Sequence, residues 1–256
     1  MEPDPTTTTS GLDLGAASTN GSTPTALAVD HLNAGYGRKQ VVFDVSFHAG
    51  EGEVVTLLGH NGSGKSTTIR TILGLLPALG GKITYHGQDV TKASSRHNVK
   101  AGMAMIPSER FVFQDLTVLD NLLLGAANAD SAVREQRFGQ VYSLFPILKE
   151  RGKQMAGTLS GGQQRMLSLG LLLMAGPKLL MLDEPSLGLA PSVVQQIFDS
   201  VKHLAATEGL SVLLLEQNVV QALRITDRAY VMRSGRVILE ETVEQMKARD
   251  SYWDLF

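Results

Sequence analysis

The fold is decided by one stretch of the chain, Gly59-His60-Asn61-Gly62-Ser63-Gly64-Lys65-Ser66-Thr67. It follows an apolar run at 54–58 and precedes a helix-like segment at 68–73. A strand, a Gly-rich loop and a helix start form the context in which G-x-x-x-x-G-K-[ST] binds nucleotide phosphates. The alternative, a Gly-rich turn before an ordinary helix, is disfavoured, because the strand, the loop, the Lys-Ser pair and the helix all match the phosphate-binding motif. The chain is therefore predicted to bind a nucleoside triphosphate.

Two side chains of this loop carry the expected chemistry. Lys65 is predicted to reach the β- and γ-phosphates, and the Ser66 hydroxyl to ligate Mg²⁺. The glycines let backbone N–H groups approach the phosphates, and the helix N-terminus adds positive potential. The predicted nucleotide-binding residues of the loop are Gly59, His60, Asn61, Gly62, Ser63, Gly64, Lys65, Ser66 and Thr67.

A second apolar strand, Lys178-Leu179-Leu180-Met181-Leu182-Asp183-Glu184, ends in two carboxylates. A buried parallel strand that delivers acids at its C-terminal end is typical of a Walker B element. Asp183 is expected to hold Mg²⁺, and Glu184 to orient and polarise the attacking water, since phosphoryl transfer depends on positioning and charge stabilisation. Alone, this pattern favours a solvated strand end. In a chain that also carries the phosphate-binding loop, a strand ending in two acids indicates hydrolysis of the bound nucleotide.

A third element, Leu159-Ser160-Gly161-Gly162-Gln163, precedes a helical run at 164–175. Ser160 can cap this helix, and Ser-x-x-Gln resembles a capping box. The two glycines leave backbone N–H groups bare at the positive end of the helix, which makes an anion site. A well-capped helix is the simpler interpretation, but Lys65 already has a phosphate site. A second subunit would explain the second anion site: Ser160 of one chain would close on the γ-phosphate held by Lys65 of the other.

The bulk composition narrows the class of protein. The 256 residues carry a net charge of −2, which argues against broad attraction to nucleic acid. The sequence has no cysteine, which excludes disulfides and thiolate chemistry and fits a reducing cytoplasm. Residues 1–25 have no Lys or Arg and are rich in Thr, Ser, Gly, Ala and Pro, so we expect a disordered tail and no signal peptide. The longest apolar runs are shorter than the roughly 20 residues that span a bilayer.

Hydrophobic patterning predicts strands that alternate with helices. Apolar residues at helical spacing over 117–154 indicate an insertion of two or three helices, and 193–205 a further helix. The predicted strands cover 26–32, 41–47, 54–58, 82–85, 102–106, 179–182 and 212–215, with a final hairpin at 229–232 and 236–239.

The three motifs, in this order and separation, resemble the ATP-binding subunit of an ABC transporter, over essentially everything from Ala26 onward. The resemblance implies an α/β P-loop NTPase of the ABC ATPase type, with a mixed-sheet core, an antiparallel β subdomain and a helical subdomain over about 110–175. It assigns residues 26–256 to the ATP-binding domain, with ATP and Mg²⁺ as cofactors. It makes Tyr36 the aromatic that stacks on adenine. The alternative for Tyr36 is a strand-end aromatic in the core.

A finer likeness lies in the stretches 182–191 and 215–218, together with 144–146 and 156–162. These resemble one of the two unlike ATPases of branched-chain amino acid importers. The resemblance implies an ATPase that energises import, with a second ATPase subunit, an integral membrane permease and, indirectly, a solute-binding protein as partners. It places the chain in the cytoplasm, peripherally on the inner face of the cell membrane.

Other functions share parts of this pattern. Urea and short-chain amide importers share much of it, so they remain an alternative for the substrate. Exporter or lipid-transport ATPases share every catalytic motif. ABC ATPases of DNA repair or translation usually carry coiled coils, zinc-binding cysteines or two cassettes, which this chain lacks.

Three positions depart from the general ABC pattern. Gln217 stands where most members have a His at the γ-phosphate; its amide can still hydrogen-bond a phosphate oxygen, so we count it with Glu184 as catalytic. Ala190 stands where an Asp usually crosses the dimer interface. The usual Q-loop Gln falls at Ser108, or at Glu109 if the register differs by one. These departures suggest pairing with a different ATPase that supplies conventional residues.

Overall fold

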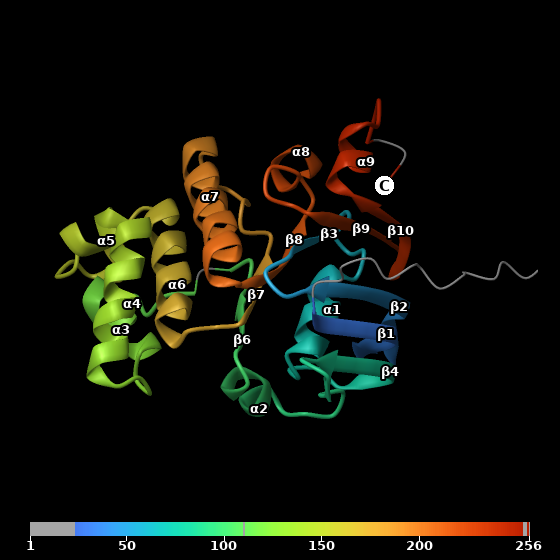
Figure 1. Ribbon diagram of the computed structural model, residues 1–256, viewed down its shortest axis with the longest axis horizontal. Helices are drawn as coiled ribbons and strands as arrows, with labels where there is room; N and C mark the ends of the chain where they lie inside the picture. The colour runs from blue at the N-terminus through green and yellow to red at the C-terminus, as the bar shows by residue number, and fades with distance from the viewer. Residues whose placement is uncertain (1–23, 110, 253–254, 256) are drawn as a thin grey trace, which may run out of the picture.

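The computed structural model describes residues 24–109, 111–252 and 255. Almost all of the predicted N-terminal tail, 1–23, lies outside the described residues. Two sheets form the framework, and helices cover them (Figure 1). No helix in the described ranges is long and apolar enough to cross a membrane.

The larger sheet has six strands in the order β10-β9-β3-β8-β7-β6. Strands β3, β6, β7, β8 and β9 run parallel, and β10 pairs antiparallel with β9. Every residue of β3, β7 and β8 is buried, as near-continuous apolar runs predict for parallel strands covered on both faces. Their bounds are β3 (Val54–Leu58), β6 (Met103–Ile106), β7 (Leu179–Asp183), β8 (Ser211–Glu216), β9 (Arg228–Arg233) and β10 (Arg236–Thr242).

The smaller sheet is antiparallel, in the order β2-β1-β4-β5. Its strands are β1 (Thr25–Tyr36), β2 (Lys39–Gly50), β4 (Ala78–Tyr85) and β5 (Gln88–Asp89). The first two are longer than predicted and continue to a tight turn after Tyr36. Gly35 allows this, because a Cβ there would lie 2.2 Å from the Lys39 carbonyl oxygen of the neighbouring strand.

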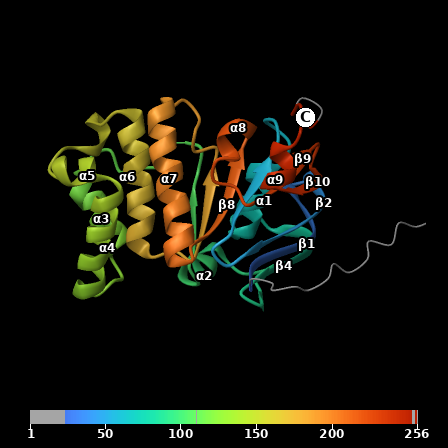
Figure 2. The same ribbon diagram turned by 45° about the horizontal axis from the view of Figure 1, so that its top comes forward.

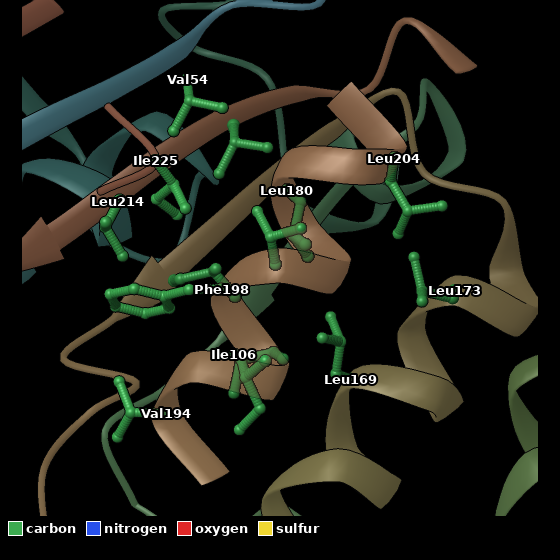
Figure 3. Packing of buried hydrophobic residues seen from close by; sticks show 14 of the residues in the cluster. Val54, Ile106, Leu169, Leu173, Leu180, Val194, Phe198, Leu204, Leu214 and Ile225 are labelled. Atoms are coloured by element: carbon green, nitrogen blue, oxygen red, sulfur yellow. The ribbon is translucent and has the colours of Figure 1, made fainter. Parts of the chain in front are cut away.

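Alternation along the strands gives the larger sheet two apolar faces. On β7, Leu180 and Leu182 face one core, while Leu179 and Met181 face the other. The first core is covered by helices, as Figure 3 shows for Phe198, which lies in one cluster with Leu180 and Leu214. The second lies against the smaller sheet and α1 (Lys65–Ile72). The result is a layered arrangement with the larger sheet in the middle.

The helices fall into groups along this framework (Figures 1 and 2). At one side lie α3 (Val118–Gly125), α4 (Ser131–Leu144), α5 (Pro146–Glu150) and α6 (Gly161–Ala175), which include the predicted helical insertion. Helix α7 (Pro191–Glu208) lies between α6 and the sheet in both views. The short helices α2 (Ser95–Lys100), α8 (Val219–Ala222) and α9 (Val243–Lys247) were not predicted, because each is too short to show helical periodicity.

Candidate active site

The carboxyl ends of adjacent parallel strands bring the predicted motifs together. Leu58 of β3 pairs with Glu216 of β8, and Asp183 of β7 pairs with Leu215 of β8. The loop after β3, the acids at the end of β7 and the turn after β8 therefore share one sheet edge. In open α/β sheets this edge is where ligands bind.

The loop after β3 is shaped as an anion cradle. Gly64, at its end, has φ 105°, a conformation that a side chain opposes. A Cβ on Gly59 would lie 2.4 Å from the Met232 carbonyl oxygen, so this position also requires glycine. The buried Ser63 hydroxyl has no hydrogen-bond partner among the described residues. A Gly-rich loop at a helix start offers its backbone N–H groups and this hydroxyl as hydrogen-bond donors, and such a set of donors fits a phosphate.

Lys65 begins α1 and is 3 % exposed. Its ammonium donates to the carbonyl oxygens of Gly59 (2.6 Å) and His60 (3.2 Å) and lies 3.3 Å from Glu184 Oε1. An ammonium has three donors, and these acceptors account for all of them. The lysine is thereby held inside the loop, against the carboxylate that the sequence predicts to act on water.

Ser66 and Asp183 meet as predicted. The Ser66 hydroxyl donates to Asp183 Oδ1 at 3.0 Å. Burial raises the pKa of Asp183 and the Glu184 charge adds to the rise, while the hydrogen bond from Ser66 and the charge of Lys65 oppose it. A hydroxyl beside a carboxylate is a donor set that Mg²⁺ accepts. Among the described residues, no group of three or more His, Cys, Asp or Glu side chains lies together as a metal site would require.

Glu184 has an unusual backbone. Its φ of 46° lies in the left-handed region, which costs roughly 1–2 kcal/mol for a residue with a Cβ. Its N–H donates to the Leu215 carbonyl oxygen at 2.9 Å, so β8 holds the residue in this conformation. Strain of this kind is typical of functional positions.

Gln217 and Tyr36 both lie at the rim of the site. Gln217 Nε2 is 3.1 Å from His60 Nδ1, so the turn after β8 contacts the phosphate-binding loop. Tyr36 is 44 % exposed at the end of β1, and its hydroxyl lies 3.5 Å from Thr67 Oγ1. The alternative of a core aromatic at Tyr36 is therefore wrong, and its ring is free to contact a base.

The segment Leu159-Ser160-Gly161-Gly162-Gln163 leads into α6 with the predicted capping box. Ser160 Oγ accepts from the Gln163 N–H, and Gln163 Oε1 accepts from the Ser160 N–H. In the described part of the chain no hydrogen bond joins Ser160 to Lys65. Helix α6, which begins at this segment, and α1, which begins at Lys65, lie apart with α7 between them in Figures 1 and 2, so the two predicted anion sites are separate within this chain.

Ser108 and Glu109 follow β6 and lie beside α6. They line a pocket of about 270 Å³ together with Gly161, Gln164, Arg165, Ser168 and Leu187–Leu189. Arg165, 8 % exposed, donates to the carbonyl oxygens of Pro107 (2.7 Å) and Ser108 (2.9 Å). Sequence reasoning missed Arg165, because a charged residue on a helix is ordinarily expected at the surface.

Comparison with known proteins places this site in a family. Residues 42–187 match the family described as ABC transporter. The chain belongs to this family. The match contains the phosphate-binding loop, residues 159–163 and the two acids, and it confirms the predicted fold class and an ATPase cassette.

Individual relatives are similar in sequence to this protein over most of its length. The chain is 44 % identical to the high-affinity branched-chain amino acid transport ATP-binding protein BraG of Pseudomonas aeruginosa, over 88 % of this chain and 98 % of that protein. It is 36 % identical to the probable branched-chain amino acid transport ATP-binding protein LivF of Archaeoglobus fulgidus, over 86 % and 94 %. A solved structure of an ATP-binding subunit of an ABC transporter is 29 % identical, with TM-score 0.78, and the match covers 90 % of this chain and 97 % of that one.

Proposed function

We propose that this chain is the ATP-hydrolysing subunit of an ABC importer for branched-chain amino acids. The substrate class rests on its similarity to BraG and LivF, whose names give that transport role. Importers of urea and short-chain amides share the same sequence pattern and are the alternative. One observation carries the enzymatic part of the proposal: Lys65, Ser66, Asp183 and Glu184 converge in one partly buried site.

Nucleotide binding begins with an exchange of partners at Lys65. Phosphate oxygens of ATP are stronger acceptors for an ammonium than the Gly59 and His60 carbonyl oxygens that it now contacts. The same exchange separates Lys65 from Glu184, now 3.3 Å away. The carboxylate is thereby freed to face a water molecule. Substrate binding and release of the catalytic carboxylate are coupled through one lysine.

Hydrolysis then depends on placement of charges. Glu184 orients and polarises the water whose oxygen attacks the γ-phosphorus, and the bond from that phosphorus to the β,γ-bridging oxygen breaks to give ADP and phosphate. Gln217 donates an amide hydrogen bond to a phosphate oxygen, and Tyr36 stacks on the adenine. Ser66 and Asp183 would hold Mg²⁺, which would supply positive charge for the transfer.

The second half of each site comes from another ATPase subunit. Ser160 and Gly162 stand at the N-terminus of α6, apart from the Lys65 site of their own chain. ATP held by Lys65 is therefore contacted by residues 159–163 of the partner, and shared contacts with the γ-phosphate favour the closed dimer. Gln217 and Ala190 depart from the usual residues, which supports an unlike partner.

The membrane permease is proposed to dock near the helical side of the molecule. Exposed apolar side chains gather along the chain between β6 and α6, at Phe111, Phe113, Leu119, Leu123, Leu124 and Met155. Exposed apolar patches of this kind mark protein contacts. Docking there would place the chain on the inner face of the cell membrane. It would also lie next to Ser108 and Glu109, which face α6.

Reconstituted transport tests this function. The chain is co-purified with its membrane partner and second ATPase subunit, placed in lipid vesicles, and supplied with the associated binding protein. ATP-dependent uptake of labelled leucine, absent with Glu184→Gln, is the expected result. Uptake of urea without leucine would move the substrate to the amide class. Outward transport only would contradict the importer assignment.

A further inference from the structure

Glu216 is a buried carboxylate that the mechanism above does not use. It is 2 % exposed and ends β8, between the strands that carry the phosphate-binding loop and the catalytic acids. Burial raises the pKa of Glu216, and N–H groups of Ser186, Asn218 and Gln217 oppose the rise. A carboxylate removed from water is retained only where specific contacts offset its desolvation. Its partners therefore indicate its role.

The side chain of Glu216 holds the loop that contains Glu184. Glu216 Oε1 accepts a hydrogen bond from the Ser186 N–H at 3.1 Å. Ser186 lies two residues beyond Glu184, whose N–H is bound by the Leu215 carbonyl oxygen. Two successive residues of β8 thus fix the chain before and after the left-handed turn at Glu184.

The main chain around Glu216 holds the other two parts of the site. The Glu216 carbonyl oxygen accepts from the Gly59 N–H at 3.3 Å, at the start of the phosphate-binding loop. The side-chain amide of the next residue, Gln217, lies 3.1 Å from His60 Nδ1. One residue therefore contacts the phosphate-binding loop, the Glu184 loop and the Gln217 turn.

We propose that Glu216 is a positioning residue, which sets Glu184 and Gln217 in register with the phosphate-binding loop. The proposal rests on the proposed ATPase function. Loss of the Glu216 carboxylate should therefore affect catalysis and not ATP binding. ATP would still contact Lys65, but Glu184 and Gln217 would no longer be held in position. Small misplacements of such groups lower kcat more than binding.

Hydrogen exchange in the wild-type chain tests the contact itself. Ser186 lies outside the helices and strands, where amides ordinarily exchange fast. Because Glu216 accepts its N–H, the Ser186 amide is expected to be protected to the degree of the neighbouring strand β7. Exchange of Ser186 at the rate of an exposed loop would overturn the proposal without any variant.

Kinetics of Glu216→Gln test the role. The amide keeps the size and one acceptor oxygen, but it lacks the charge that strengthens the hydrogen bond from the Ser186 N–H. The matched control is Glu53→Gln, because Glu53 also accepts a backbone N–H, that of Gly50 at 2.7 Å, near the opposite end of β3. We expect kcat to fall about tenfold or more in Glu216→Gln, with the Kd for ATP little changed, and neither to change in Glu53→Gln.

The other outcomes are equally decisive. An unchanged kcat in Glu216→Gln, or equal losses of kcat, ATP affinity and thermal stability, would overturn the positioning role. In both cases, hydrolysis of ATP by the wild-type chain would leave the ATPase part of the proposed function intact. A wild-type chain that binds ATP and never hydrolyses it would instead contradict the proposed function.

Discussion

Lys65 Nζ lies 3.3 Å from Glu184 Oε1, with the lysine 3 % and the glutamate 14 % exposed. A phosphate that takes up the ammonium must separate this pair. In the proposed mechanism, this contact keeps Glu184 engaged until ATP takes up the ammonium. We propose that this contact links ATP binding to hydrolysis through one lysine.

Ser160 is expected to serve a partner's ATP, and a second capping box provides its control. Thr242 caps α9 with Gln245 as Ser160 caps α6 with Gln163. Ser160→Ala and Thr242→Ala should each lower the free energy of unfolding by about 1 kcal/mol. Only Ser160→Ala should lower ATP turnover of the assembled ATPase, by about tenfold. Equal turnover in the two variants, measured beside denaturant unfolding, would show that Ser160 is a cap alone.

Tyr36 is expected to contribute stacking energy to adenine. Tyr36→Ala should raise the Kd for ATP about tenfold, since stacking of a base on an aromatic ring contributes about 1–3 kcal/mol. Tyr36→Phe keeps the ring and should bind almost as wild type. Titration with a fluorescent ATP analogue measures both. If the Phe variant loses as much affinity as the Ala variant, the hydroxyl near Thr67 is the functional group and the ring is not.

Gln217 and His60 are expected to act as one unit. Because their side chains are 3.1 Å apart, removal of either takes away one contact of the other. Gln217→Ala and His60→Ala should each lower kcat, and the double variant should be no slower than the slower single variant, because effects of contacting residues are not additive. Steady-state ATPase rates of the three variants give the answer. A double variant whose loss equals the product of the single losses would mean that the two act independently.

Asp183 is expected to be required for ATP hydrolysis and, when ionised, to lower the free energy of unfolding. Burial raises its folded-state pKa, so the folded protein binds this proton more tightly than the unfolded chain, and stability falls as pH rises through that pKa. Asp183→Asn should hydrolyse no ATP, yet unfold at a higher temperature than wild type near neutral pH. The difference should shrink as pH falls and the wild-type carboxyl protonates. Thermal unfolding of both proteins is measured from neutral to acidic pH without nucleotide or metal. A difference in unfolding temperature that grew as the pH fell would contradict a raised pKa of Asp183 as the cause.

Local sequence signals predicted the parts of the site that each belong to one element. The phosphate-binding loop, the Asp183-Glu184 strand end and the Ser160 capping box all lie where the sequence predicts them. Their chemistry follows from residue type and spacing within a few positions.

Contacts between elements that no shared motif chemistry connects were out of reach of the sequence. The hydrogen bond from Ser186 to Glu216 and the clamp of Arg165 on Pro107 and Ser108 join residues 30 and more than 50 positions apart. The left-handed backbone of Glu184 also depends on β8 and not on local propensity. A charged residue that closes the apolar run of 212–215 is the local signal that could have singled out Glu216.

ATP turnover by Glu184→Gln tests the central claim most directly, that Glu184 is the catalytic carboxylate freed from Lys65 by ATP. The amide preserves the size of the side chain but cannot polarise water as a carboxylate does. The account predicts that ATP binding is retained and the closed dimer accumulates, while turnover falls by at least about 100-fold. Turnover equal to that of the wild-type chain would contradict it.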